Sequence, residues 1–398
     1  MGEIRHHDDD NINHHIKKPK LTQTLISPAQ ILTEFAHHAP ETARINNGSF
    51  GSVPNTITTS QRQFHLKFLS QPDQFFFNTL PKQILTSRKL LRSLINADDV
   101  SEVALVDNAT TASAIVLQNV GRGFSEGRYA RNDVVVMFSC AFQAVKKSID
   151  AYVRRAGGEV VVVDLPFPVR EKDEIVNAVI MPVKELVKVC REEGVDRVFV
   201  DAAHAIGSVS VDVKEIGADF YVSNLHKWFF CPPSVAVLYS RKDVAEDLHH
   251  PVVSHEYGNG LAIESAWIGT RDYSPQLVVP DVFEFVNRFE GGIEGIMKRN
   301  HDAVVEMGEM LAKSWGTSLG APPEMCPNRF GVEVPIHYQP LRDEEAGPRD
   351  QSGGFVTGYA RISHQVYNTV DDYIKFRDAV NQLLRDGFSC KMLIPREE

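Results

Sequence analysis

The sequence predicts an α/β protein with a mainly parallel central sheet flanked by helices, followed by a smaller C-terminal α+β domain. From residue 100 onward, short apolar runs alternate with helical segments, and such runs joined by helical crossovers are typical of a parallel sheet covered on both faces. After about residue 290, a helical pattern at His301–Ser314 precedes a strand pattern at Val332–His337. The 398 residues, 43% of them hydrophobic, are enough for two or three domains with a sizeable core.

Along the chain we expect four regions: a disordered tail at 1–26, an N-terminal segment at 27–55, a large domain at 56–290 and a small C-terminal domain at 291–398. The tail is polar and rich in histidine, and a disordered tail would not hold these side chains around a metal, so we expect no metal site. Folded structure is predicted to begin where Ser27 can cap a helix and Pro28 can occupy its first turn. The stretch Ile45–Gly51, with two glycines and two asparagines, is predicted to be a loop.

The strands of the predicted sheet place polar side chains just after their carboxyl ends. Ligands in sheets of this kind bind beyond those ends, so residues there are the first candidates for a functional site. The predicted strands are Glu102–Val106, Val134–Phe138, Val160–Asp164, Arg197–Asp201, Phe220–Val222 and Ser234–Tyr239.

Charge and cysteine usage limit the class of function. The 52 acidic and 42 basic residues give a formal net charge of −10, so we expect a small-molecule substrate and no nucleic-acid or membrane partner. No apolar run approaches the roughly 18–20 residues of a membrane span. The five cysteines are scattered without a CxxC pair, which favours a reducing compartment over a disulfide scaffold. We therefore expect a cytoplasmic protein, with a nuclear or organellar location left open.

Two residues at neighbouring strand ends form the central chemical pair. Asp201 ends one apolar run, and Lys227 follows the next strand in an otherwise apolar segment. Taken singly, the aspartate is more often a turn or cap residue, and the lysine a half-buried member of an ion pair. Together they match pyridoxal-phosphate (PLP) chemistry, which needs a lysine amine to bind the cofactor aldehyde and a carboxylate facing the pyridine nitrogen.

Three further motifs fit the same site, although each has a simpler explanation. Asp107–Ala112 joins a strand to a helix, and its small hydroxylated residues at a helix N-terminus suit a phosphate, whereas a plain N-cap is the default. Phe142 follows the next strand, where it can stack on a flat cofactor or simply belong to the core. Arg361 matches an amino-acid carboxylate, with a surface ion pair as the alternative.

Six short motifs are distributed over the chain: Asn-Asn-Gly-Ser-Phe-Gly at 46–51, Asn-Ala-Thr-Thr at 108–111, Asp-Ala-Ala-His at 201–204, Asn-Leu-His-Lys-Trp at 224–228, Trp-Ile-Gly-Thr-Arg-Asp at 267–272 and Arg-Ile-Ser at 361–363. In these motifs the chain resembles class V aminotransferase-like enzymes of PLP fold type I. Within that family it is most similar to the plant L-cysteine desulfhydrases and, near them, to isopenicillin N epimerase-like proteins. The resemblance runs from about residue 27 to the C-terminus.

The resemblance implies a role for each matching residue. Lys227 would be the Schiff-base lysine and would move protons at the substrate carbons, Asp201 would pair with the pyridine nitrogen, and His204 would lie near the 3′ oxygen of the ring. Phe142 would stack on the ring. Thr270 would reach the phosphate of the partner subunit, which implies a homodimer. The remaining roles are phosphate binding by Ala109, Thr110, Asn224 and His226, and substrate binding by Arg361, at the carboxylate, and Asn47.

Two departures from the family pattern narrow the expected activity. Many relatives have a histidine where Phe142 stands, so more of the acid–base work falls to Lys227. Cysteine desulfurases have a nucleophilic cysteine shortly before the carboxylate-binding arginine, and Arg342–Tyr359 contains none. A β-elimination needs no such nucleophile, so the expected reaction converts L-cysteine to hydrogen sulfide, pyruvate and ammonia. Epimerisation, transamination and a desulfurase-like reaction are the alternatives.

The chain is shorter than the family pattern in two places. Between Asp164 and Asp201, helical pattern fills nearly all of the length and no strand can be placed, although fold type I has a strand inside the sheet there. Losing that strand would leave ladder groups unpaired. A strand and a helix are also missing near Cys326–Gly331. We therefore hypothesise a shortened isoform or an imperfect gene model with impaired or absent activity, or a non-catalytic homologue that dimerises with a full-length partner.

Overall fold

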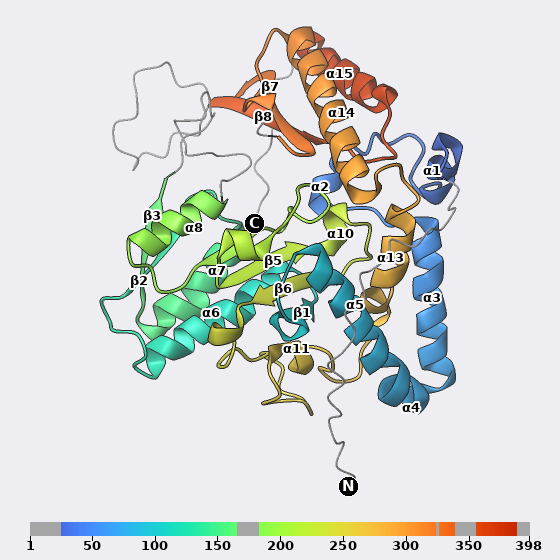
Figure 1. Cartoon of the computed structure of the whole chain (residues 1–398). Helices are drawn as coiled ribbons and strands as arrows, with labels where there is room; N and C mark the ends of the chain where they lie inside the picture. Colours follow the sequence, from blue (N-terminus) through green and yellow to red (C-terminus); the bar gives the residue numbers. More distant parts are fainter. Residues whose placement is uncertain (1–24, 165–182, 324–325, 339–355, 388–398) are drawn as a thin grey trace.

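The computed structural model describes residues 25–164, 183–323, 326–338 and 356–387. A mixed sheet forms the middle of the molecule, helices pack around it, and a two-stranded ribbon with two helices lies at one end (Figure 1). Residues 1–24 of the predicted tail lie outside the described residues. The division of the chain into four regions stays a prediction.

The helix predicted to begin at Ser27 is confirmed as α1 (Pro28–Glu34). Ser27 and Gln30 cap it reciprocally, because the Ser27 hydroxyl accepts from the Gln30 N–H (3.3 Å) and the Gln30 side chain accepts from the Ser27 N–H (2.8 Å). The loop predicted at Ile45–Gly51 is partly wrong, since its middle forms one helical turn, α2 (Asn47–Phe50). The other helices of this region are α3 (Asn55–Ser70), α4 (Pro72–Gln74), η1 (Phe75–Thr79), α5 (Leu80–Leu94) and η2 (Val100–Glu102).

The main sheet has four strands in the order β1-β6-β5-β4, and all six predicted strands form with ends within two residues of the prediction. The pairs β4–β5 and β2–β3 are parallel, while β6 runs antiparallel to both of its neighbours. The short connection from β5 to β6 permits this reversal, because only parallel neighbours need a long crossover. The strands are β1 (Val103–Val106), β2 (Val134–Phe138), β3 (Glu159–Val163), β4 (Phe199–Asp201), β5 (Phe220–Asn224) and β6 (Ala236–Ser240).

Helices pack on the main sheet through two buried apolar clusters. One cluster joins α6 to the sheet through side chains such as Ile115, Val222 and Leu238, and the larger one fills the other side. Burial of this apolar surface is the main term that stabilises the fold. The helices after β1 are α6 (Ala109–Ser125), α7 (Gln143–Ser148), η3 (Ile149–Val153), η4 (Arg154–Ala156), α8 (Val183–Glu192), α9 (Val213–Ile216), α10 (Leu225–Trp228), η5 (Lys242–Val244), α11 (Leu261–Glu264), α12 (Ser274–Leu277) and α13 (Val279–Val286).

The parallel pair β2–β3 forms a sheet of its own, and no strand among the described residues connects β2 to β4 (Figure 1). This agrees with the sequence, in which no strand could be placed between Asp164 and Asp201. The helical pattern predicted at Glu171–Ile180 lies outside the described residues. The two sheets differ in burial. Every residue of β1, β5 and β6 is buried, whereas Val136 in β2 is 56% exposed and Val161 in β3 is 47% exposed. β2 and β3 therefore bury one face only, against α6 and η3.

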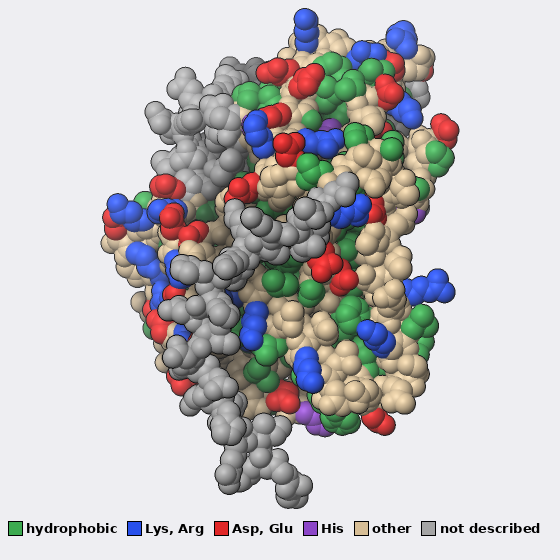
Figure 2. Space-filling model, turned by 45° about the vertical axis from the view of Figure 1, so that its right-hand side comes forward, with side chains coloured by type: hydrophobic (Ala, Val, Ile, Leu, Met, Phe, Trp, Pro, Cys, Tyr) green, Lys and Arg blue, Asp and Glu red, His purple; other side chains and the backbone are tan. Residues whose placement is uncertain are grey.

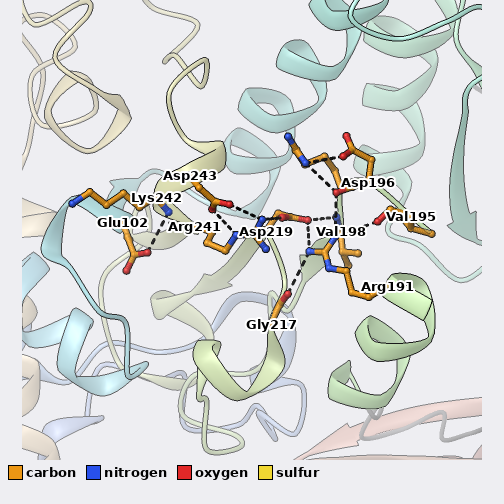
Figure 3. Close-up of polar contacts among 11 residues, drawn as sticks. Glu102, Arg191, Val195, Asp196, Val198, Gly217, Asp219, Arg241, Lys242 and Asp243 are labelled. Atoms are coloured by element: carbon orange, nitrogen blue, oxygen red, sulfur yellow. Dashed lines mark hydrogen bonds and ion pairs between the residues drawn. The ribbon is translucent and has the colours of Figure 1, made fainter. Parts of the chain in front are cut away.

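A buried carboxylate fixes the three-residue β4 at the end of the strand opposite to Asp201 (Figure 3). Asp219, fully buried just before β5, accepts hydrogen bonds from the Val198 N–H and from Arg191 of α8, both at 2.6 Å. Arg241, just after β6, lies 3.1 Å from the other carboxylate oxygen. These partners tie the start of β4 to β5, β6 and α8, although the outer edge of β4 has no strand beside it in the described part of the chain.

The C-terminal part combines a long helix with an antiparallel ribbon. α14 (Gly292–Trp315) contains the predicted helix, and β7 (Arg329–Tyr338) contains the predicted strand. β7 pairs with β8 (Val356–Ser363), and a buried apolar cluster joins this ribbon to α14 and to α15 (Val370–Arg385).

The second predicted shortening falls where α14 connects to β7. The described residues between α14 and β7 form no α-helix. They run beside β7 instead: Gly320 N–H donates to the Gly331 carbonyl (2.7 Å), and Glu333 N–H donates to the Ser318 carbonyl (2.9 Å). The chain then enters β7 directly at Arg329.

On the face shown in Figure 2, Lys and Arg side chains of the described residues lie scattered among Asp and Glu. None of the helices in the described part of the chain combines the length and apolar character needed to cross a membrane.

Candidate active site

Lys227 lies just beyond the carboxyl end of β5, on the short helix α10. Its backbone carbonyl accepts a hydrogen bond from Nδ2 of Asn47 (2.9 Å), and Oδ1 of Asn47 accepts from the Tyr367 hydroxyl (2.9 Å). The backbone of Gly51 packs on the same turn, where a Cβ would lie 1.6 Å from the His226 carbonyl oxygen. The α2 segment, α10 and the residues after β8 therefore meet at the lysine.

The Lys227 amine faces an imidazole whose tautomer is set by a tryptophan. Nζ lies 3.1 Å from Nε2 of His204, and the indole N–H of Trp228 donates to Nδ1 of the same ring (3.2 Å). An indole N–H can only donate, so Nδ1 is an unprotonated acceptor and the neutral ring carries its proton on Nε2. Burial, followed by the charges of Arg329 and Lys227, lowers the pKa of His204, so the ring stays neutral. The Nε2–H group then donates to the uncharged form of the Lys227 amine.

The surroundings of Lys227 favour that uncharged form. Burial lowers the pKa of the amine to about 8, with a further lowering by the charge of Arg329 and a smaller one by Arg361, while the charge of Asp201 opposes them. At neutral pH about a tenth of the amines are therefore uncharged. An uncharged amine is the nucleophile that adds to an aldehyde.

Asp201 ends β4 beside β5, with its backbone paired to Val222. Its Oδ1 accepts a hydrogen bond from the Ala203 N–H (3.1 Å). Surrounding protein raises the pKa of the carboxyl, while the Ala203 N–H and the charge of Lys227 lower it. The residue keeps some exposed surface, and the nearby charge of Lys227 favours the carboxylate form of Asp201. The structure thus brings the predicted amine and carboxylate to the same edge of the sheet, near enough to affect each other's charge.

The predicted phosphate-binding residues gather at the N-terminus of α6. The Ala109 N–H donates to Oδ1 of Asn224 (2.8 Å), which joins α6 to the end of β5, and Asn108 caps the helix. Thr110 is exposed beside them. Nδ1 of His226 is buried and has no hydrogen-bond partner among the described residues.

These residues fit PLP. The helix N-terminus, the hydroxyl of Thr110 and the unpartnered nitrogen of His226 suit a phosphate group. Asp201 and Lys227 would supply the carboxylate and the amine that the pyridine nitrogen and the aldehyde of PLP need. A single PLP molecule would engage both sets.

Two residues that were predicted to contact the cofactor have exposed side chains. Phe142 is 65% exposed at the start of α7, and Thr270 is exposed in the loop before α12. The next residue, Arg271, forms an ion pair with Asp107, just before α6, so this loop lies beside α6 of its own chain. The stacking role of Phe142 and the intersubunit role of Thr270 stay predictions.

The predicted substrate residues are Arg361 and Asn47. Arg361 on β8 donates to Oδ1 of Asn46 (3.1 Å) and to the Ser49 hydroxyl (2.5 Å), and its exposed guanidinium keeps further N–H groups for a carboxylate. Asn47 is 2% exposed and holds the Lys227 carbonyl. Its effect in this structure is on the lysine, and its contact with substrate stays a prediction.

Sequence reasoning missed Arg329. It begins β7 directly after Asn328, whose fully buried side chain donates to the Gly207 carbonyl (3.1 Å), three residues beyond His204. The charge of Arg329 lowers the pKa of Lys227 and of His204. The residue falls where the chain departs from the family pattern, so no motif pointed to it. A polar Asn-Arg pair immediately before an apolar strand was the available signal.

This fold and this arrangement of side chains are those of a PLP-dependent enzyme of fold type I. The profile of the aminotransferase class-V family matches residues 174–274. The solved structure of an apo cysteine desulfurase from Thermococcus onnurineus NA1 has a similar fold, with a TM-score of 0.66 and 17% identity over 86% of this chain and 94% of that one.

Two plant relatives are similar over nearly the whole chain. An L-cysteine desulfhydrase of Arabidopsis thaliana is 55% identical over 98% of this chain and 99% of its own. The "Probable L-cysteine desulfhydrase, chloroplastic" of the same plant is 51% identical over 97% of this chain and 92% of its own. The chain belongs to the L-cysteine desulfhydrase family.

The first of these alignments also reports on the predicted shortening. It spans 449 positions, whereas 98% of the 398 residues is about 390, so about 59 positions of the alignment have no residue from this chain. The chain therefore lacks sequence that this relative has. The placement of the missing residues at the two interrupted regions stays a prediction.

Proposed function

We propose that this chain is a PLP-dependent carbon–sulfur lyase that eliminates sulfide from L-cysteine to give pyruvate and ammonia. The observation that carries the proposal is the Lys227 amine held 3.1 Å from His204 at the strand edge that also carries Asp201. The family to which the chain belongs supports the same reaction, because the two plant relatives are named for it.

PLP, when bound, supplies an electron-accepting ring that stabilises negative charge at the substrate Cα. Arg361 orients the substrate by its α-carboxylate. Lys227 takes the proton from Cα onto Nζ, which lies beside His204. Burial and the charge of Arg329 keep part of that amine uncharged and ready to accept the proton. The electron pair at Cα then forms the Cα=Cβ bond while the Cβ–Sγ bond breaks and its electron pair leaves on sulfur. The released aminoacrylate tautomerises to an imine, and water hydrolyses this to pyruvate and ammonia. Asp201 would hold the pyridine nitrogen of bound PLP in its protonated form.

The reaction needs no cysteine nucleophile, and Cys326, which precedes Arg329, is poorly placed to be one. Cys326 is 1% exposed, and its thiol donates to the Pro322 carbonyl (3.6 Å). A thiol that is shielded from solvent and donates to a backbone carbonyl is not placed to attack a substrate, so direct elimination is favoured over persulfide formation.

The test is an absorbance spectrum and a sulfide assay of the purified protein with added PLP. We expect a yellow, borohydride-reducible protein that releases sulfide and pyruvate in equal amounts from L-cysteine. Lys227→Ala should abolish both the reducible absorbance and the sulfide, while the exposed control Lys242→Ala should change neither. A racemised amino acid, or a keto acid formed with pyridoxamine phosphate, would assign a different PLP reaction, and absence of the reducible absorbance would assign a non-catalytic homologue.

A reduced rate is the second part of the proposal, because the sheet that carries Asp201 is split from β2 and β3. We propose that the shortened chain is less active than a version with the two missing segments restored. Sulfide release at equal rates from the two versions would refute this.

We also propose a homodimer in a reducing compartment, the cytoplasm. Exposed apolar side chains near the Thr270 loop support a subunit contact: Phe77 is 65% exposed and touches Trp267, and Val253 is 68% exposed. Light scattering after gel filtration tests the dimer, and a Phe77→Asp variant should shift it to a monomer. Imaging of the tagged chain tests the compartment, since one plant relative is named chloroplastic.

A further inference from the structure

Arg329 is a partly buried cation with no carboxylate beside it among the described residues. Burial, followed by the charge of Arg361, lowers the pKa of Arg329 to about 10, and the only opposing group is the thiol of Cys326. Removing a cation from water without a counter-charge is unfavourable. An anion bound beside Arg329 would relieve this cost.

The register of the β7–β8 ribbon places Arg329 and Arg361 on one face. Arg329 lies opposite Ser363, and Gly331 lies opposite Arg361. Residues opposite each other in an antiparallel pair share a face, so the two arginines are diagonal neighbours, roughly 7–8 Å apart at the backbone. Gly331 puts no side chain between them. Two guanidinium groups on long side chains can therefore meet one small ligand from the same surface.

This face of the ribbon looks onto the proposed active site. Asn328 anchors the start of β7 to the Gly207 carbonyl, and the Ser363 hydroxyl accepts a hydrogen bond from the Gly48 N–H (3.3 Å). Among the charges acting on Lys227, that of Arg329 has the largest effect, ahead of Arg361. Arg329, the more buried of the two arginines, therefore shares the site with the amine that acts on the substrate carbons.

We propose that Arg329 is a second anion-binding residue, which recognises a negative charge on the β-carbon substituent of the amino-acid substrate while Arg361 binds the α-carboxylate. The inference rests on the proposed function for the direction in which the substrate lies. It assigns the site to amino acids whose β-substituent is anionic, such as a thiolate or a sulfonate, over those with a neutral substituent.

Two thiol-free amino acids test the proposal by equilibrium binding to the protein loaded with PLP, with pyruvate assayed after each titration to verify that neither probe was turned over. L-cysteate has a sulfonate on Cβ, and L-alanine has the same backbone without that charge. Calorimetry should show L-cysteate binding about 10- to 100-fold more tightly than L-alanine, the range expected for one charge-assisted contact. In Arg329→Met this preference should disappear, with L-alanine binding unchanged, and in Arg329→Lys part of it should persist.

Two control variants separate this role from others. Arg361→Met should weaken both probes equally, and the exposed Arg155→Met should leave both unchanged. Arg329→Met should fold, because replacing an unpaired desolvated cation by an apolar side chain is not destabilising. If the preference for L-cysteate survives in Arg329→Met, or both probes weaken together, the proposal is overturned.

The same measurements distinguish this proposal from the proposed function. Binding of the probes needs no turnover, so a protein that releases no sulfide but loses its L-cysteate preference in Arg329→Met would refute the lyase and support the anion site. Sulfide release from L-cysteine with equal binding of the two probes would support the lyase and refute the anion site.

Discussion

Asn47 and Lys227 are 180 positions apart in the sequence, and a 2.9 Å hydrogen bond joins the asparagine side chain to the lysine carbonyl. The bond fixes the backbone of Lys227, and so it sets the direction in which the amine leaves α10. Tyr367 holds the other end of the same amide. The N-terminal segment and the C-terminal part thus position the central lysine together.

Asn47→Asp should lower the rate of sulfide release about 10-fold with little change in KM, because a carboxylate cannot donate to the Lys227 carbonyl but can still accept from Tyr367. The free energy of unfolding should fall by about 3–5 kcal/mol, because the variant leaves a buried acceptor unsatisfied and also buries a carboxylate. Steady-state kinetics and urea unfolding check these values. Asn55→Asp, where an exposed amide donates to the Thr33 carbonyl, is the matched control and should cost less than about 0.5 kcal/mol. A raised KM at unchanged rate would instead indicate direct substrate contact.

Alanine variants of Gly51 and Gly316 distinguish the cost of a left-handed backbone conformation from the cost of a steric clash. Both have positive φ, at 72° and 65°, but a Cβ would lie 1.6 Å from the His226 carbonyl oxygen at Gly51 and would meet nothing within 4 Å at Gly316. Gly316→Ala should cost about 1 kcal/mol of unfolding free energy. Gly51→Ala should cost more than about 3 kcal/mol and disturb PLP binding, because α2 and α10 must separate. Equal losses in the two variants would contradict the close approach.

The rate of PLP uptake by the PLP-free protein should rise with pH through a midpoint near pH 8 and level off about one unit higher. The pKa of the Lys227 amine is lowered from 10.5 to about 8, so the amine is charged and unreactive below that value and uncharged above it. Burial and the charges of Arg329 and Arg361 cause the lowering, against Asp201. Stopped-flow absorbance measures the midpoint.

Trp228→Phe should move this midpoint to higher pH. Without the indole donor, His204 can carry its proton on Nδ1 and accept from the charged amine through Nε2, which stabilises the ammonium form. A midpoint that does not move would show that the tryptophan leaves the tautomer of His204 free.

Hydrogen exchange should distinguish the two sheets. Amides of β1, β5 and β6, whose residues are all buried, should exchange at the rate of global unfolding, and those of β2 and β3 should exchange at least about ten times faster, since that pair buries one face only. Uniform protection across the six strands would mean that they open as one unit.

The local pattern of the sequence predicts the strands well and their surroundings less well. Continuous apolar runs mark β1 to β6, and polar side chains after β4 and β5 mark Asp201 and Lys227, because strand ends are where such groups meet. The direction of β6 depends on the length of a connection rather than on composition. The helical turn α2 depends on contacts with α10, which lies about 180 positions away.

Arg329 is a residue of the candidate site that the sequence alone did not predict. Its importance arises from the pairing register of β7 with β8 and from the anchor of Asn328 on Gly207, both of which are long-range. A resemblance carries over residues that match a motif, and this one lies where the chain departs from its family. The tautomer of His204 is likewise set by a neighbour in space, Trp228, and not by its own motif.

The unpaired edges of β2 and β4 have a consequence for handling the protein. Along both edges, backbone N–H and C=O groups have no strand beside them in the described part of the chain, and Val134 and Val136 expose apolar surface on β2. Such an edge is a template on which strands of other molecules can add. Concentrated samples are therefore expected to aggregate through main-chain pairing, and lysine in place of Val136 should delay it.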